Sequence, residues 1–422
     1  MSAAPGSEWE ALGLGADMSA LAAAHWPAPN DVQRAALPAL LRQDDDAVIG
    51  AETGSGKTLA YLLPAAQRAI ATRRADTPYP AALVLVPNRE LGTQLQRVAK
   101  RLGADTVWPF TDDKLFSLEA RHGGVLARWP YAPGKAPDVL VATPSFAAAF
   151  DKDLDLWEGL SIVVLDEADM LLDGGFKKQI DRCLVALKRV ERRRESGADL
   201  VEEPQERCRR VVVAATLPNQ GLRSVDSLVS KYFANATRVS NGDDALPMHG
   251  VVSTLDHTFK KVNNDDERDA LLTDLLQSTE RTMVFCMTAS RAQHLAERLA
   301  SDGVAAAPYT KEVEPERRLA TLDLFASSKI NVLVCTDLAA RGLDLPAVAK
   351  VIQFDFATNA VSHLHRVGRA ARAGESACAV SFVDESNADL VAALAKGDTV
   401  ENAFSRRRGL RARNKKLRAE GE

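Results

Sequence analysis

The sequence predicts an α/β fold with two doubly wound parallel-sheet domains and a short basic C-terminal tail. Short, continuous apolar runs alternate with helical patterns, and the alternation occurs twice along the 422 residues. Continuous apolar runs are typical of strands buried on both faces of a parallel sheet. Polar, turn-like clusters follow these runs directly. Ligands of such sheets bind at the carboxyl ends of the strands, so these clusters are the expected sites of chemistry.

Nine apolar runs are predicted as strands. They cover residues 47–51, 82–86, 139–142, 162–165 and 211–215 in the first half, and 283–286, 332–335, 351–354 and 377–383 in the second. Helical patterns lie between them at residues 58–71, 290–300 and 314–325. This order of strands and helices predicts a doubly wound sheet in each half of the chain.

The predicted organisation has five parts: an N-terminal flank (1–24), a first domain (25–242), a linker (243–253), a second domain (254–398) and a basic tail (399–422). The linker is predicted from the Gly, Asp and Pro residues around it. Residues 190–210 form a charge-dense insertion in the first domain without apolar periodicity. We predict a solvated or disordered loop there.

Charge is distributed unevenly along the chain. The formal net charge is −4, but residues 405–422 contain eight basic and two acidic side chains. The remaining chain therefore has 45 basic and 55 acidic residues. A polyanionic partner must be held by individually placed residues and by the tail, to which we assign salt-dependent affinity.

Several classes of protein are disfavoured by composition. The five cysteines are odd in number, far apart and without a CxxC pair, which argues against a zinc site or a disulfide framework. We expect buried or incidental thiols in a reducing compartment. No apolar run approaches the ~20 residues that span a bilayer. The first twenty residues contain no Lys or Arg, so neither a secretory signal nor a transit peptide is visible.

A glycine-rich loop, AETGSGKT, follows the first predicted strand at residues 51–58. Its glycines allow successive backbone N–H groups to face phosphate oxygens, and the next helix adds its positive N-terminal end. Lys57 is predicted to reach the β- and γ-phosphates and the Thr58 hydroxyl to bind Mg²⁺. The predicted ATP-binding residues of this loop are Thr53, Gly54, Ser55, Gly56, Lys57 and Thr58.

An acidic cluster, Asp166-Glu167-Ala168-Asp169, follows the fourth strand. Asp166 is predicted to hold Mg²⁺, and Glu167 to orient or polarise the attacking water. A lone acidic cluster at a strand end is usually a solvated turn. The phosphate-binding loop upstream favours catalysis instead.

This Asp-Glu-Ala-Asp tetrapeptide and the order of the surrounding motifs, from about Trp26 to Val383, resemble the DEAD-box family of RNA helicases. The resemblance implies two tandem RecA-like domains, ATP and Mg²⁺ as cofactors, and RNA-stimulated ATP hydrolysis. The hydrolysis would drive local duplex unwinding or remodelling of RNA–protein complexes. The expected partner is structured RNA, with ribosomal RNA as a candidate, contacted without sequence readout. We expect a monomer that does not associate with membranes.

Residues 26–33 resemble the family's Q motif, in which an aromatic residue, a threonine and a glutamine recognise adenine. Trp26 stands for the usual Phe and Asn30 for Thr, while Gln33 is retained. Residues 87–94 resemble the PTREL motif and 142–145 the TPGR motif, with Phe146 in place of Arg. The RNA contacts implied there are Pro87, Arg89, Glu90, Thr143 and Pro144.

In the second half, residues 336–344 resemble the motif that touches both RNA and nucleotide. The resemblance assigns Thr336 to RNA and Gly342 and Asp344 to ATP. Residues 365–372 resemble HRIGRTGR, in which Arg369 and Arg372 would be arginine fingers at the γ-phosphate. The further residues implied by resemblance are His365 in catalysis and Arg318 and Arg366 in RNA binding.

The family's SAT motif reads Ala214-Ala215-Thr216 here, so one hydroxyl and a hydrogen bond worth about 1 kcal/mol are missing. These three residues and Asp169 are the predicted coupling residues. Three interpretations follow: an unwinding enzyme, an ATP-dependent RNA clamp or assembly scaffold with weak unwinding, and a DNA-directed or other P-loop ATPase. Gln33 and the unmodified DEAD sequence disfavour the third.

The sequence AATLP, the variant Arg-Ala-Ala-Arg-Ala-Gly, the charged insertion and the basic ending together resemble a plant and algal organellar subgroup. That subgroup is associated with chloroplast ribosomal RNA and large-subunit assembly. The resemblance suggests a chloroplast or mitochondrial location, with the cytoplasm or nucleus as the alternatives.

Overall fold

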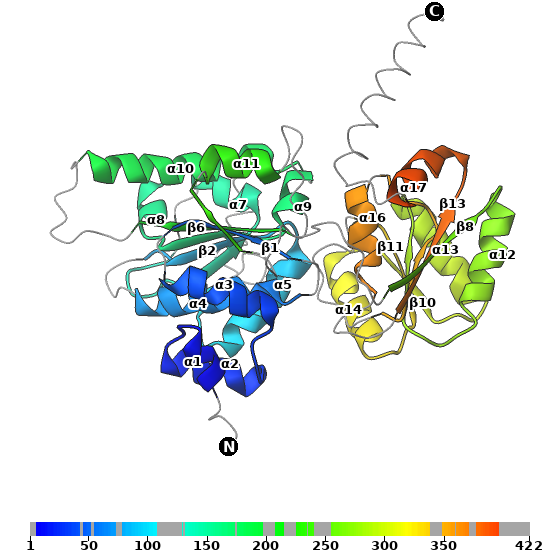
Figure 1. The fold of residues 1–422 in the computed structure, drawn as a ribbon, viewed down its shortest axis with the longest axis horizontal. Helices are drawn as coiled ribbons and strands as arrows, with labels where there is room; N and C mark the ends of the chain where they lie inside the picture. The colour runs from blue at the N-terminus through cyan, green and yellow to red at the C-terminus, as the bar shows by residue number, and fades with distance from the viewer. Residues whose placement is uncertain are drawn as a thin grey trace, which may run out of the picture. The chain divides into compact units, whose positions relative to one another are not determined.

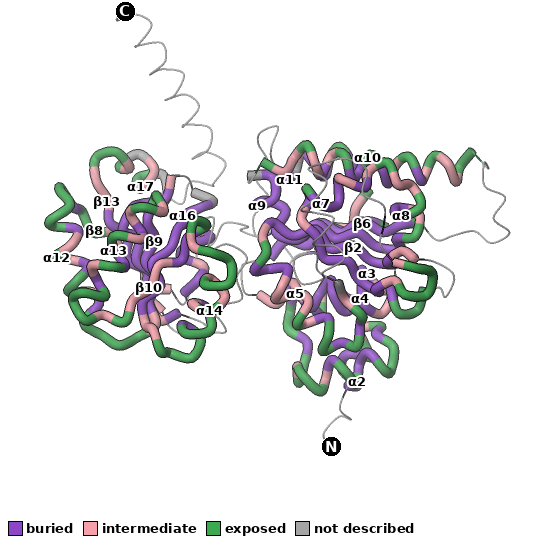
Figure 2. Tube along the Cα trace, turned by 180° about the vertical axis from the view of Figure 1, so that it is seen from behind, coloured by how far each residue is buried: buried purple, intermediate pink, exposed green. Residues whose placement is uncertain are grey.

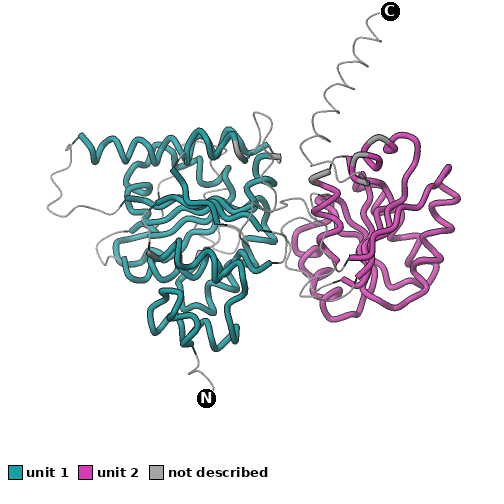
Figure 3. Tube along the Cα trace, in the orientation of Figure 1, with its two compact units in different colours: residues 1–51, 55–217, 221–246 teal, residues 52–54, 218–220, 247–422 magenta. Residues whose placement is uncertain are grey.

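The computed structural model describes residues 6–42, 45–51, 55–72, 78–107, 129, 131–173, 175–196, 207–214, 225–233, 235–239, 255–337, 348–358, 360–370 and 377–395. Of these, residues 6–239 belong to one compact unit and residues 255–395 to a second (Figure 3). The predicted linker (243–253) and tail (399–422) lie outside the described residues.

The first unit is built on a parallel sheet whose strands are β1 (Ala47–Gly50), β2 (Ala82–Leu85), β3 (Thr106–Val107), β4 (Val139–Ala142), β5 (Ile162–Leu165), β6 (Arg209–Ala214) and β7 (Thr237–Val239). Their order is β3-β4-β2-β5-β6-β1-β7. All described pairings are parallel. The five predicted strands are confirmed. The edge strands β3 and β7 were not predicted, because two or three residues are too few to show a pattern.

Helices cover both faces of this sheet (Figure 1). One layer contains α1 (Ser7–Ala11), α2 (Ala16–His25), α3 (Asp31–Arg42), α4 (Lys57–Ala71) and α5 (Arg89–Arg101). The other contains α7 (Pro144–Ala149), α8 (Leu154–Glu158), α9 (Ala168–Asp173), α10 (Lys177–Glu195) and α11 (Val225–Tyr232). Helix α4 is buried almost throughout, because it contacts α2, α3 and α5 as well as the sheet.

The predicted N-terminal flank is part of the first unit. Trp9, Met18 and Ala22 belong to the same hydrophobic core as α3 and α4. The indole Nε1 of Trp9 donates to the carbonyl oxygen of Trp26 at 3.2 Å. The flank therefore fixes the backbone at the start of the Q-motif segment.

The loop predicted over residues 190–210 is wrong at both ends. Helix α10 continues to Glu195, and β6 already begins at Arg209. Arg209 is buried and donates to the carbonyl oxygen of Ala39 at 2.8 Å, while Arg210 pairs with Asp46 at 2.6 Å. The prediction treats charged side chains as solvated, but buried charges occur when they are paired. Residues 197–206 lie outside the described part.

The second unit has a six-stranded parallel sheet in the order β10-β11-β9-β12-β13-β8. Its strands are β8 (Leu255–Lys261), β9 (Thr282–Phe285), β10 (Ala306–Tyr309), β11 (Val332–Cys335), β12 (Lys350–Gln353) and β13 (Ala377–Val383). The four predicted strands are confirmed. The edge strands β8 and β10 were missed, because they are only partly buried and lack a continuous apolar run.

Two layers of helices cover this second sheet (Figure 1). Helices α12 (Asp265–Leu275) and α13 (Ala289–Ser301) form a core on one face. Helices α14 (Pro315–Ala326) and α16 (Ala360–Val367) form a core on the other. The last described helix is α17 (Ala388–Ala395), which follows the 3-10 turn η1 (Glu385–Asn387).

The five cysteines are distributed over both units. All five are free, and all except Cys378 are buried. Burial raises the pKa of the Cys183 and Cys286 thiols, which keeps both groups protonated. Among the described helices, none combines the length and apolar character needed to cross a membrane.

Candidate nucleotide and RNA site

The carboxyl edge of the first sheet gathers the predicted motifs of that unit. Across the sheet, β4 leads to Thr143, β2 to Pro87, β5 to Asp166, β6 ends at Ala214, and β1 leads to Ala51. Parallel strands place these ends on one edge. The predicted RNA motifs therefore occupy one side of the edge and the nucleotide motifs the other.

The described part of the P-loop is folded onto its own backbone. Lys57 is buried at the start of α4, and its Nζ donates to the carbonyl oxygen of Ala51 at 2.7 Å. Gly56, just before it, has a φ of 82°, a conformation that glycine adopts without strain. An incoming phosphate would replace the Ala51 carbonyl as the partner of the ammonium group.

Asn30 and Gln33 hold the same loop. Asn30 Nδ2 donates to the carbonyl oxygen of Ser55 at 2.9 Å, and Gln33 Nε2 donates to that of Gly56 at 3.1 Å. Each side-chain oxygen also accepts the other residue's backbone N–H at 3.0 Å. Both ends of the Gln33 amide are thus engaged within the protein. A Cβ on Gly56 would lie 2.2 Å from Asn30 Nδ2, so this packing favours glycine there.

Trp26, the predicted adenine-side aromatic, is half-buried directly after α2. Its ring meets His25 edge-on at 5.6 Å. Sequence interpretation assigns no role to Trp9. Its long-range bond to the Trp26 carbonyl could be found only in the folded chain.

Asp166 and Glu167 are buried together immediately after β5. Asp166 Oδ1 accepts the Glu167 N–H at 3.0 Å, and Oδ2 accepts the Tyr61 hydroxyl at 2.7 Å. Burial raises the pKa of Asp166, the Glu167 carboxylate adds to the rise, and Tyr61 and Lys57 oppose it. A cation close to Asp166 would therefore favour the ionised form of this carboxyl group.

The backbone of Glu167 has a φ of 50°, which is uncommon for a residue other than glycine. Within the described part of the chain, its buried Oε2 has no hydrogen-bond partner. Strained backbone and unsatisfied buried oxygens both concentrate at functional sites. Glu167 is consequently the residue whose geometry best suits interaction with a reacting group.

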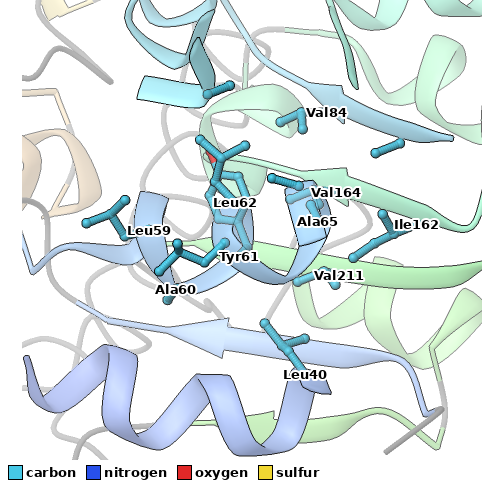
Figure 4. Close-up of a cluster of buried hydrophobic side chains, with 14 of the residues drawn as sticks. Leu40, Leu59, Ala60, Tyr61, Leu62, Ala65, Val84, Ile162, Val164 and Val211 are labelled. Carbon is cyan, nitrogen blue, oxygen red and sulfur yellow. The ribbon is translucent and has the colours of Figure 1, made fainter. Parts of the chain in front are cut away.

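Tyr61 is a residue of this site that sequence interpretation missed. It lies in the buried helix α4 among apolar side chains (Figure 4), and its hydroxyl bonds both Asp166 and Thr58. Burial raises the pKa of this hydroxyl, and the charge of Asp166 raises it further. The hydroxyl therefore stays protonated and connects the two predicted Mg²⁺ ligands. The available signal was a polar group three residues after Thr58 within an apolar helix.

The donor set fits Mg²⁺ held mainly by a nucleotide. The described residues contain no group of three or more His, Cys, Asp or Glu side chains that could hold a metal. Mg²⁺ usually takes one or two carboxylates together with substrate phosphates, not a protein cage. One buried carboxylate, Asp166, with the Thr58 hydroxyl one hydrogen-bonded step away, matches that preference.

Ala214 connects the predicted coupling motif to the nucleotide loop. It pairs in register with Gly50, and its carbonyl oxygen accepts the Ala51 N–H at 3.3 Å. Helix α9, which carries the buried Asp169, contacts β6. The Asp169 carboxylate accepts the N–H of Met170 at 3.0 Å. The structure thus brings Ala214 and Asp169 onto neighbouring elements.

The predicted RNA residues of the first unit cluster at two helix starts. Pro87 precedes α5, Arg89 begins it as an exposed side chain, and Glu90 is buried. Thr143 caps α7, with its Oγ1 accepting the Phe146 N–H at 3.3 Å, and Pro144 is the first helical residue.

Phe146, which replaces the family's Arg, is buried with its ring centroid 5.4 Å from that of Phe150. It contributes to the hydrophobic interior. The structure therefore supports the expected loss of one RNA-gripping side chain at this position.

In the second unit, Arg366, the predicted RNA ligand, is hydrogen-bonded within the protein. It is only 1% exposed. Its guanidinium donates to Asp337 Oδ2 at 3.0 Å, to the Asp355 carbonyl oxygen at 2.6 Å and to Gln353 Oε1 at 3.3 Å. Arg366 therefore holds Asp337, the half-buried neighbour of Thr336, and its contact with RNA stays a prediction.

Among the other described motif residues of this unit, Thr336 is buried and Arg318 is half-buried. His365 and Arg369 are buried, and Arg369 Nε donates to the His365 carbonyl oxygen at 3.3 Å. Arg318 donates to the carbonyl oxygens of Lys311 and Val313, both at 3.0 Å, and so stabilises the turn before α14.

Two family models match the chain: DEAD/DEAH box helicase over residues 30–225, and helicase conserved C-terminal domain over residues 267–374. DEAD-box ATP-dependent RNA helicase 22 of Oryza sativa subsp. japonica is 32% identical, and the alignment covers 97% of this chain and 84% of the relative. The chain belongs to the DEAD-box ATP-dependent RNA helicases. ATP-dependent rRNA helicase rrp3 of Aspergillus niger is 33% identical, covering 86% of this helicase and 71% of the relative.

A solved structure shows the same fold as this helicase. S. cerevisiae Dbp5 bound to RNA and ADP BeF3 superposes with a TM-score of 0.71 at 24% identity, covering 93% of each chain. The predicted α/β fold with two tandem RecA-like domains is confirmed. Seven of the helicase's predicted or motif residues lie outside the described part, and their roles stay predictions: Thr53, Gly54, Ala215, Thr216, Gly342, Asp344 and Arg372.

Proposed function

We propose that this helicase uses RNA-stimulated ATP hydrolysis at Asp166 and Glu167 for local unwinding of RNA duplexes or remodelling of RNA–protein complexes. The supporting observation is the buried acidic pair itself. Asp166 bonds the Tyr61 hydroxyl on the P-loop helix, and Glu167 keeps one oxygen free of described partners. Both follow a strand that lies between the RNA-motif strands and the P-loop strand.

The proposed roles follow from the chemistry of each group. Lys57 leaves the Ala51 carbonyl to bind the β- and γ-phosphates, while Thr58 and Asp166 hold Mg²⁺, which would neutralise phosphate charge. Glu167 orients the attacking water. Arg369 and Arg372 are proposed to act at the γ-phosphate, where a guanidinium supplies permanent charge, and His365 is proposed as a further catalytic residue.

Gln33 and Asn30 are proposed to report on the nucleotide. Their present bonds hold the Ser55 and Gly56 carbonyls, so an adenine that pairs with Gln33 must compete with the P-loop backbone. Binding of the base and opening of the loop would then be linked, because a shared donor cannot serve both partners.

The first test compares Lys57→Ala with Glu167→Gln. We expect both to lower RNA-stimulated ATPase about 100-fold or more. Lys57→Ala should also lose nucleotide affinity, whereas Glu167→Gln should keep it, since the amide preserves shape. ATP turnover with and without RNA and binding of a fluorescent ATP analogue separate the two effects. Equal turnover in the absence of RNA would contradict the proposal.

A second candidate function is an ATP-dependent RNA clamp or assembly scaffold with weak unwinding. The observation that favours it is Ala214, a fully buried methyl group where the family has a serine. A clamp of this kind would still hydrolyse ATP, because the residues predicted for hydrolysis are present. It would separate strands weakly, because the hydrogen bond of the serine is missing.

The proposal also covers the class of RNA that this helicase binds and the cell compartment in which it works. A relative named as an rRNA helicase supports ribosomal RNA as the substrate of this chain. The relatives compared come from a plant and a fungus, and the subgroup resemblance favours chloroplast or mitochondrion. Crosslinking in cells, followed by sequencing of the bound RNA and organelle fractionation, tests both parts.

A further inference from the structure

Helix α10 carries a concentration of positive charge in an otherwise acidic chain. Eight of its nineteen residues are basic and three are acidic. Several of these cations have partners within the first unit. These are Lys177 with Asp181, Arg182 with Asp151, Arg193 near Asp155 and Glu158, Arg194 with the Glu158 carbonyl, and Lys188 over the Tyr232 ring.

The other three cations of α10 have no such partner among the described residues. Lys178, Arg189 and Arg192 are exposed and form no hydrogen bond or ion pair with the described residues. Retaining three unpaired cations on one helix opposes folding slightly through mutual repulsion. Hydrogen bonds and ion pairs within the described residues therefore do not account for these three cations, which are available to a partner of opposite charge.

These residues lie on a single face of the helix. Together with Arg182 they recur at intervals of three, four or seven residues, which places them along one line. We call Lys178, Arg182, Arg189 and Arg192 the basic stripe. The opposite face of α10 is buried against the unit, and Figure 2 shows exposed segments alternating with buried ones along the helix. At 1.5 Å per residue the stripe is about 21 Å long.

The position of α10 relates the basic stripe to the RNA motifs. Helix α10 packs directly on α7, which begins at Thr143 and Pro144. Between Arg182 and Arg189, the same face of the helix exposes Val185, an aliphatic residue. Single-stranded RNA is usually held by aromatic stacking, whereas duplex RNA is recognised through its phosphate backbone and shape. A straight, rigid row of cations without aromatic rings fits the second kind of partner.

We propose that the basic stripe of α10 binds the phosphate backbone of an RNA duplex that flanks the strand held by the DEAD-box motifs. The inference rests on the proposed function, because it adds a second contact to the same RNA. It assigns α10 to substrate binding without sequence readout and without a part in ATP hydrolysis.

The test is the triple variant Lys178→Gln, Arg189→Gln and Arg192→Gln in the full chain. A matched control is Arg97→Gln, Lys100→Gln and Arg101→Gln on α5, which removes the same charges from exposed positions of the same unit. Affinity is measured over a salt series for a single-stranded oligonucleotide and for the same strand carrying a duplex arm. Circular dichroism and melting confirm folding of both variants.

We expect the α10 variant to bind the duplex-bearing RNA about 10-fold more weakly at 0.1 M salt, with a salt slope smaller by about 2–3. ATPase activity stimulated by the single strand should stay at the parental level. An unchanged duplex affinity overturns the inference, as does an equal loss in the α5 control. Loss of polyglutamate binding with RNA binding intact would assign the stripe to an acidic protein and also overturn it. If RNA fails to stimulate the parent enzyme, the proposed function fails instead.

Discussion

The hydroxyl of Tyr61 shows how one side chain can organise a catalytic carboxylate. A buried, unpaired carboxylate is strongly destabilising, and Asp166 avoids this through two donors, Tyr61 and the Glu167 N–H. The same hydroxyl bonds Thr58. The two predicted Mg²⁺ ligands are therefore oriented before any metal arrives.

Tyr61→Phe removes this hydroxyl while keeping the ring. We expect a loss of about 1–3 kcal/mol in the free energy of unfolding, because Asp166 Oδ2 loses its donor. We also expect the half-saturating Mg²⁺ concentration for ATPase to rise about 10-fold, as when a residue that orients a metal ligand is removed. Chemical denaturation and Mg²⁺ titration of ATPase and of nucleotide binding measure the two effects.

Tyr309→Phe is the matched control, since Tyr309 is also fully buried but lies in the second unit. It should leave the Mg²⁺ requirement unchanged even if stability falls. A Tyr61→Phe enzyme with normal Mg²⁺ dependence would restrict Tyr61 to packing.

At the level of elements, the second unit contains a buried polar network that joins a helix to three strands. Gln353 on β12 bonds His363 of α16 at 2.9 Å and Ser381 of β13 at 2.8 Å. Ser381 in turn bonds His257 of β8 at 2.9 Å, and Arg366 of α16 bonds Gln353. The network ties the edge strand β8 to the helix that carries the HRVGR motif.

This network makes the second unit sensitive to acid. Burial, together with the adjacent His257 and Arg366, lowers the pKa of His363 to about 3. The unfolded chain gains a proton below about pH 6.5, whereas folded His363 does not. Stability is therefore complete above that pH and falls as pH decreases, by about 2 kcal/mol between pH 6.5 and 5. Hydrogen exchange of β12 and β13 at the two pH values measures the loss.

His363→Gln should remove most of this dependence, because the amide can still bond Gln353 and does not titrate in this range. His294→Gln, at an exposed histidine of α13, is the control and should change nothing. An equal pH dependence in the parent and in His363→Gln would contradict the assignment.

At the scale of the whole molecule, ATP hydrolysis and strand separation are distinct properties. The first unit contains Lys57, Asp166 and Glu167, the residues predicted to act in hydrolysis. At the end of β6, however, it has Ala214 where the family has a serine hydroxyl. If ATP and RNA each favour the same arrangement of the enzyme, each must increase affinity for the other. We predict that this chain departs from its family in the coupling of that arrangement to unwinding.

Ala214→Ser should restore a hydrogen bond worth about 1 kcal/mol and raise the unwinding rate several-fold, with ATPase nearly unchanged. A strand-displacement assay with parallel ATP turnover measures the ratio. Ala214→Val, which enlarges the side chain without a hydroxyl, is the control for packing. Improvement of neither activity in the serine variant would reject the coupling role of this position.

The two α/β units, nine of their strands and the order of the motifs were predictable from local sequence pattern. These features depend on local pattern: continuous apolar runs predict strands buried on both faces, and GKT after a strand predicts a phosphate loop. The places of Lys57, Asp166 and Glu167 at the ends of their strands therefore follow from local pattern alone.

Tertiary structure alone decided which polar groups meet. Tyr61 reaches Asp166 across 105 residues, and Arg210 reaches Asp46 across 164. Arg366 bonds Asp337, Gln353 and the Asp355 carbonyl oxygen, partners that its local motif does not reveal. The physical reason is that burial and pairing of a charge depend on distant partners, which local sequence pattern cannot reveal.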